Sequence, residues 1–210
     1  MRRTPTGYVL LAFLLTACAQ DLNKHNAMRY YNLALRAEQA KDYAGAKEAY
    51  RRALINARDG EAPQAGISAA TYGLGRMTGY TCEYAAAERL LREALELEQT
   101  LPYPVPGNIS KRLSELARLT FDEGKYQDSV AFYEQALPIL EKLGAPRSDP
   151  VGYASYLEDY AFAMARNGNE NNAAQVRAKA LAIRRANPGK EAQFVPLYYR
   201  DVCDVNPSLR

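Results

Sequence analysis

The two residue types most specific to nucleophilic catalysis and zinc binding, histidine and cysteine, are rare in this 210-residue chain. The candidates are one histidine, His25, and three cysteines, Cys18, Cys82 and Cys203. With a single histidine, a serine or cysteine nucleophile would lack a neighbouring base, and a zinc site would lack ligands. Adjacent carboxylates such as Asp122 and Glu123 point apart on a helix. The sequence therefore predicts neither an enzyme nor a metal site.

A glycine-rich run, Gly73 to Gly79, has the spacing of a dinucleotide-binding loop. That chemistry needs a strand before the loop and a helix that starts within it, so that backbone N–H groups meet the pyrophosphate. The run lies instead inside a segment of helical pattern, where Gly75 occupies a packing position. We therefore expect no nucleotide and no other cofactor.

The first residues have the pattern of a secretory signal. Arg2 and Arg3 precede an apolar run over residues 8–15, and small residues follow it. The run is too short to span a bilayer as a helix, which needs about twenty residues. We therefore expect residues 1–17 to be removed on export and residues 18–26 to form a polar spacer before the fold.

The segment Leu15-Thr16-Ala17-Cys18 resembles the lipobox of bacterial lipoproteins. The resemblance implies that Cys18 is acylated and that its lipid holds the mature chain at a membrane. In lipoproteins of enteric bacteria an aspartate after the cysteine retains the protein in the inner membrane. Here Ala19 follows, which favours the periplasmic face of the outer membrane. The alternative is a signal cut by the ordinary peptidase, with Cys18 an incidental thiol.

An internal repeat indicates the secondary structure of the chain. An Ala-Leu pair begins at residues 53, 94, 136 and 180, at spacings of 41, 42 and 44 residues. Nineteen residues before each of these alanines stands another small residue: Ala34, Gly75, Ala117 and Ala161. Turns and further small residues lie between the two marks, and Gly and Pro separate the units. This pattern predicts pairs of helices in close contact, stacked as an all-α solenoid.

The pattern resembles the tetratricopeptide repeat over residues 27–187. The matching positions are the turn aromatics Tyr43, Tyr84 and Tyr126 and the later Tyr50, Leu91 and Tyr133. The long period is similar to the extended repeats of kinesin light chains, and HEAT-type repeats share it as an alternative. The four expected units cover residues 27–60, 68–101, 110–143 and 154–187. Residues 188–210 are expected to form a cap and tail, with a short helix over residues 194–202 that covers the last unit.

Charge argues against a nucleic-acid partner. The chain has 27 lysines and arginines and 24 acidic residues. Without Arg2 and Arg3 the cations number 27 − 2 = 25, so the mature chain is close to neutral. A nucleic-acid binder needs a basic field for phosphate contacts, and this composition provides none.

Export would place Cys82 and Cys203 in an oxidising compartment. Cys82 lies in the turn of the second unit and Cys203 lies beyond the fourth. A bond between them requires the tail to fold back, since bonded alpha carbons lie within about 7 Å. The sequence leaves open an intramolecular disulfide, free thiols or a link to another chain.

The tetratricopeptide resemblance implies that the first helix of each unit lines a concave groove. The residues that it places there, at i, i+4 and i+8 spacing, are Tyr31, Leu35, Tyr72, Arg76, Tyr80, Lys111, Arg118, Glu158, Phe162 and Arg166. Tyrosine and arginine are frequent anchors of protein interfaces. The alternative is that these side chains are partly buried or form a solvated face.

Three functions follow from these features. The first is a membrane-anchored adaptor or scaffold that binds a protein, peptide or helix in its groove within a cell-envelope assembly. The second is a structural protein that self-associates as a homo-oligomer, through its convex face or the tail around Tyr198 and Tyr199, without a groove ligand. The third is an enzyme or small-ligand binder, for which the sequence offers no set of residues.

Overall fold

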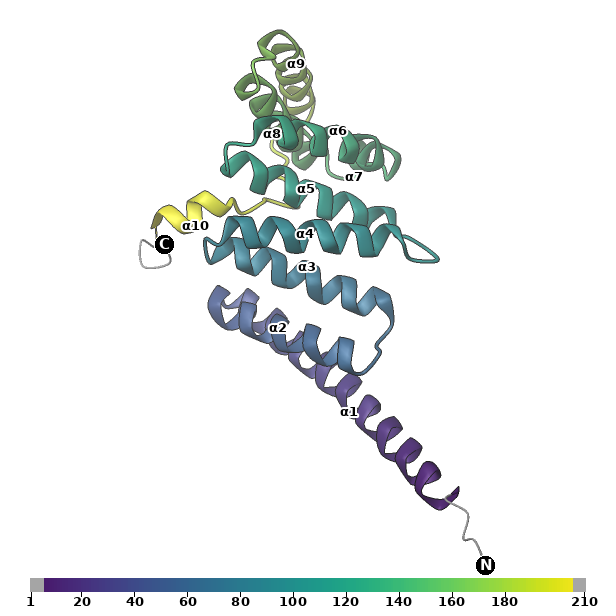
Figure 1. The fold of residues 1–210 in the computed structure, drawn as a ribbon. Helices are drawn as coiled ribbons and strands as arrows, with labels where there is room; N and C mark the ends of the chain where they lie inside the picture. Colours follow the sequence, from purple (N-terminus) through teal and green to yellow (C-terminus); the bar gives the residue numbers. More distant parts are fainter. Residues whose placement is uncertain (1–5, 206–210) are drawn as a thin grey trace, which may run out of the picture.

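A computed structural model describes the backbone of residues 6–205 and the side chains of residues 19–204 (Figure 1). Residues 1–5 of the expected signal and the side chains of residues 6–18, Cys18 included, lie outside the described part. The lipid anchor therefore stays a prediction. No helix of the described residues is both long enough and apolar enough to cross a membrane.

All regular structure in the described residues is helical. The helices are α1 (Thr6–Gln39), α2 (Tyr43–Asp59), α3 (Gln64–Tyr80), α4 (Tyr84–Gln99), α5 (Pro106–Asp122), α6 (Tyr126–Lys142), α7 (Ala145–Ser148), α8 (Pro150–Arg166), α9 (Glu170–Ala186) and α10 (Tyr199–Val205). Four antiparallel hairpins, α1–α2, α3–α4, α5–α6 and α8–α9, stack in sequence order (Figure 1). This arrangement confirms the predicted all-α solenoid with a short C-terminal helix.

The small residues of the repeat are the points where helices touch. All eight are buried: Ala34, Gly75, Ala117, Ala161, Ala46, Ala87, Ser129 and Ala173. Short side chains let the helix axes approach, and larger apolar side chains such as Leu91 and Leu116 fill the space beside them. Gly73 serves the same purpose, because a Cβ there would lie 2.4 Å from the ring of Tyr50. The glycine run is thus a packing surface within α3.

Each hairpin turns through one residue with left-handed backbone. These residues are Lys41, Cys82, Gly124 and Gly168, with φ of 59°, 67°, 77° and 82°. The N–H of the next residue then bonds to a carbonyl five positions back, as from Asp42 to Ala37 at 2.9 Å. This motif satisfies the last carbonyls of the first helix. The turn therefore repeats with the spacing of the Ala-Leu pairs.

Lys41→Gly should stabilise the fold, because a left-handed conformation costs a lysine about 1–2 kcal/mol and a glycine nothing. The greater freedom of glycine in the unfolded chain cancels part of this gain. We expect the free energy of unfolding to rise by roughly 0.5–1 kcal/mol, measured as a higher urea midpoint at unchanged slope. Gly124→Ala, the reverse change, should lower it. A lower midpoint for Lys41→Gly would contradict this account of the turn.

The residues after α9 run back along the stack, and we call residues 188–205 the tail. Its helix α10 packs on α3 and α5 (Figure 1). The expectation that this helix covers the last unit is therefore wrong. A disulfide joins Cys203 to Cys82, with the two alpha carbons 5.8 Å apart. The pairing that the sequence left open is thus intramolecular here, and it ties the tail to the second hairpin.

Candidate functional site

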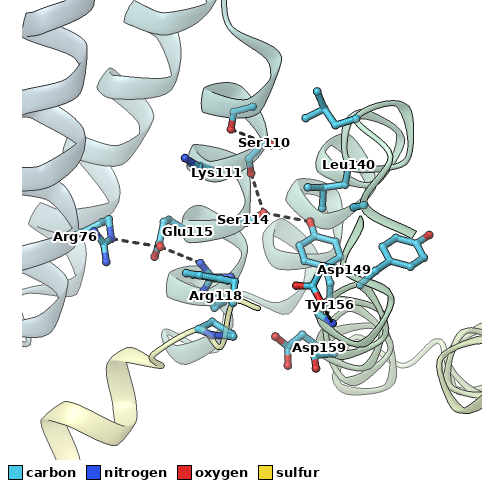
Figure 2. Close-up of a pocket in the computed structure, with 18 of the residues that line it drawn as sticks. Arg76, Ser110, Lys111, Ser114, Glu115, Arg118, Leu140, Asp149, Tyr156 and Asp159 are labelled. Atoms are coloured by element: carbon cyan, nitrogen blue, oxygen red, sulfur yellow. Dashed lines mark hydrogen bonds and ion pairs between the residues drawn. The ribbon is translucent and has the colours of Figure 1, made fainter. Parts of the chain in front are cut away.

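A cavity of about 620 Å³ lies against the first helices of the hairpins (Figure 2). Its walls come from α1, α3, α5 and α8, from the end of α6 and the connection that follows it, and from the tail. The stack brings these helices side by side because each hairpin repeats the same register. The cavity is therefore a product of the whole array.

The floor of the cavity is a buried ion cluster centred on Glu115 of α5 (Figure 2). Its carboxylate lies 2.9 Å from Nη2 of Arg118 and 3.4 Å from Nε of Arg76. Arg76 also donates to Glu38 of α1 at 2.6 Å. Burial would raise the pKa of the Glu115 carboxyl, but Arg118 and Arg76 outweigh it and hold that pKa below its usual value of 4.5. The cluster therefore stays charged at neutral pH and joins α1, α3 and α5.

A second buried ion pair lies beside this floor. Arg112 of α5 and Glu98 of α4 are 3.0 Å apart, and each side chain is less than 5% exposed. Arg112 also donates to Ser68 at 2.8 Å and covers the ring of Tyr72 at 5.0 Å from its centroid. This pair could not be predicted from the sequence, because a charged residue on a helix is usually solvated. It fixes Tyr72 in the wall of the cavity.

The opposite wall belongs to α8. Asp149 caps this helix by accepting from the backbone N–H of Gly152 at 2.9 Å. Tyr156 lies 3.5 Å from Ser114 of α5, hydroxyl to hydroxyl, and its ring meets Tyr133 edge-on. These contacts close the gap between the third and fourth hairpins at one end of the cavity.

The rim of the cavity is cationic and apolar. Lys111 is exposed, and none of the ion pairs among the described side chains involves it. Leu143 and Phe194 line the same opening and are 51% and 64% exposed. Large apolar side chains at a concave site, near a free cation, are typical of a surface that binds another molecule.

Four of the predicted groove residues line this cavity: Tyr72, Arg76, Lys111 and Arg118. Tyr80 lies farther along α3, buried under the tail, where its hydroxyl donates to the carbonyl of Leu197. Tyr31 meets Tyr50 edge-on, and Leu35 is 39% exposed on α1. Neither residue of α1 lines the cavity.

The three residues predicted on α8 also lie away from the cavity. Glu158 accepts from Arg184 of α9 at 2.7 Å, Phe162 packs on Phe121, and Arg166 covers the ring of Tyr126. The α8 residues that line the cavity are Gly152, Tyr153, Ser155, Tyr156 and Asp159. The predicted register assumed that all first helices present equivalent positions. The spacing of Tyr153 and Tyr156 is a signal in the sequence that would have indicated this face, and the prediction did not use it.

Solved structures of other proteins are similar to this fold. No protein-family model and no curated protein matches the sequence. BtubC (BKLC) from P. vanneervenii has a similar structure, with a TM-score of 0.69 at 20% identity over 81% of this chain and 70% of that one. Kinesin-light-chain-type TPR-like repeats of Podosopora anserina give 0.65 at 20% identity over 88% and 90%. MamA gives 0.59 at 16% over 77% and 80%. The chain is therefore a tetratricopeptide-type solenoid in fold.

Proposed function

We propose that this chain is a scaffold that binds a segment of a partner protein in the cavity on its first helices. The observation that carries the proposal is a cavity with a charged floor, aromatic walls and a rim formed by the unpaired Lys111 and exposed apolar side chains. Its volume of about 620 Å³ lies within the range of roughly 300–1,000 Å³ for ligand sites. Helical solenoids commonly use such concave surfaces to bind other proteins.

The proposal includes a lipid anchor on Cys18 at the periplasmic face of the outer membrane, as part of a cell-envelope assembly. The support is the lipobox resemblance of residues 15–18. In the structure α1 runs unbroken through residues 19–26 and projects from the stack (Figure 1). At about 1.5 Å per residue, this helical segment would hold the first repeat roughly 13 Å from the lipidated residue.

The alternative of self-association through the tail has less support. Tyr199 is fully buried, and Tyr198 bonds to Asp159 of the same chain. The aromatic residues expected to join copies are therefore used within one molecule. Among the described residues no three His, Cys, Asp or Glu side chains gather as a metal site.

Lys111 is the position from which to test the groove. A photoreactive amino acid there, in living cells, should crosslink the partner, and mass spectrometry should then identify it. Lys111→Glu should weaken that partner's binding roughly tenfold, about 1.4 kcal/mol, because it reverses the cation that, among the described residues lining the opening, has no ion pair. Arg76 and Arg118 are unsuitable for charge reversal because both belong to the buried ion cluster.

Arg89, exposed on the second helix of the second hairpin, is the matched control. Arg89→Glu changes the net charge equally on the other side of the stack and should leave the affinity unchanged. Both variants should unfold within about 0.5 kcal/mol of the wild type, as surface substitutions usually do. Equal loss of binding in both variants would rule out the cavity as the site.

A further inference from the structure

The tail makes at least one specific polar contact at each of four successive residues. Tyr80 donates to the carbonyl of Leu197 at 3.1 Å. Tyr198 donates to Asp159 at 2.7 Å, and Tyr199 donates to Glu115 at 2.7 Å. The backbone N–H of Arg200 donates to Asp122 at 3.2 Å, and its guanidinium lies 3.7 Å from the same carboxylate. We call the residues that receive the tail, Gly79, Tyr80, Glu115, Asp122 and Asp159, the tail channel.

Within the tail channel, α3 forms a fitted pocket for one aromatic ring. The ring of Tyr199 is fully buried, and its centroid lies 4.7 Å from that of Tyr80. A Cβ on Gly79 would lie 2.4 Å from this ring. The pocket therefore exists only because residue 79 has no side chain.

The carboxylates of the tail channel need donors from whatever occupies it. The side chain of Asp122 is only 1% exposed, and its Oδ1 has no hydrogen bond. Burial raises the pKa of Asp122 and of Asp159, against the lowering effects of Arg200 on the first and of Tyr198 on the second. Buried carboxylates without donors are costly, so the occupant must bring hydroxyl or cationic groups.

Resting on the function proposed above, we propose that the tail channel binds a segment of the partner protein. That segment carries two phenol side chains and a guanidinium at three successive positions. The tail of this chain fills the channel in the partner's absence and thereby shows which chemistry fits. The cavity of about 620 Å³ continues the same surface, since Phe194 and Pro196 of the tail form part of its wall. The partner's segment would thus displace the tail and extend into the cavity.

The disulfide controls access to the tail channel. The chain joins the tail to α9, so the tail competes at the effective concentration of a tethered ligand, about millimolar for short flexible links, and the bond between Cys82 and Cys203 fixes its other end as well. Cys82 is partly exposed, so the thiolate of a dithiol can attack this bond. Two electrons and two protons pass to the two sulfurs, and the dithiol closes to its own disulfide. The tail then stays joined to the fold only where it leaves α9, and noncovalent contacts alone hold it in the tail channel.

The test uses the full chain and a fluorescent peptide with the sequence of residues 193–205, with serine at position 203. Binding is measured by fluorescence anisotropy. The Cys82→Ser/Cys203→Ser double variant should bind this probe at least tenfold more tightly than the oxidised wild-type protein, because its own tail can leave. Adding Arg200→Ala to the protein, which weakens only the competing tail, should tighten binding further. A probe with phenylalanine for both tyrosines and glutamate for the arginine should bind at least tenfold more weakly.

Two glycines of α3 provide the control for location. Gly79→Ala in the double variant should abolish probe binding, because the new methyl group fills the ring pocket. Gly66→Ala, on the same helix, meets no atom within 4 Å and should bind the probe normally. Circular dichroism should show equal helix content in both variants.

Three outcomes would overturn the inference. Absence of probe binding to every variant would mean that the tail only stabilises the fold. Probe binding that Gly79→Ala leaves intact would place the site elsewhere. A concentration-dependent dimer of the double variant in light scattering would mean that tails exchange between copies. None of these outcomes depends on Lys111, so they are distinguishable from failure of the proposed cavity function.

Discussion

Replacing Glu115 with glutamine is expected to lower the free energy of unfolding by about 3–5 kcal/mol, because it leaves buried cations without their counter-charge. The side chain of Arg118 is only 6% exposed and has no other carboxylate within ion-pair distance in the described structure. Arg76 keeps Glu38, so most of the loss should arise from Arg118. Urea unfolding followed by circular dichroism measures the change.

The pH dependence of Glu115→Gln gives an independent check. Since the folded-state pKa of Glu115 lies below 4.5, its contribution is present above that pH and is lost as the pH falls through the folded pKa. The stability difference between wild type and variant should therefore shrink in acid. Glu48→Gln, which removes an exposed helix-surface pair with Arg51 and Arg52, should hardly change stability. An equal effect of the two substitutions would contradict the role given to the buried cluster.

Reduction of the disulfide is expected to cost about 4–5 kcal/mol, because the bond closes a loop of 121 residues in the unfolded chain. The expected result is a lower urea midpoint when a dithiol reductant is present. The transition should also broaden, since hairpins of a solenoid without the tie contact only their neighbours.

The Cys82→Ser/Cys203→Ser variant is the matched control for this experiment. It should have the midpoint of the reduced protein and should not respond to reductant. A wild-type midpoint that does not change on reduction, with both thiols shown to be free by alkylation and mass measurement, would contradict the stabilising role of the bond.

The repeat made most of the fold predictable. Small residues such as Ala34 and Ala117 are required where two helices approach closely, so their spacing predicted where the helical hairpins lie. The turn aromatics and the breakers between units located the ends of the helices. The polar residues 19–26 suggested a spacer, but they are part of α1. Their sequence could not distinguish the two, because polar residues occur both in spacers and in exposed helices.

The candidate site was predictable only in part. Tyr72, Arg76, Lys111 and Arg118 followed from the register of the second and third units. The path of the tail did not, because residues 188–198 have no periodic pattern and their contacts lie far away in the sequence. The role of Glu115 was also hidden. A charged residue becomes a buried centre only when three helices and the tail surround it, which sequence spacing does not encode.

The bond between Cys82 and Cys203 also changes how the molecule would carry a mechanical load. In a solenoid with both ends free, a pulling force passes through every hairpin in turn, since each hairpin contacts only its neighbours. Here a pull between the N-terminal helix and the C-terminal end would pass through the first hairpin and α3 and then cross the disulfide directly into the tail. The third and fourth hairpins lie off this path and would keep their shape under tension. For a protein held by one end, that would leave the α5–α8 wall of the cavity undistorted while the rest of the chain bears the force.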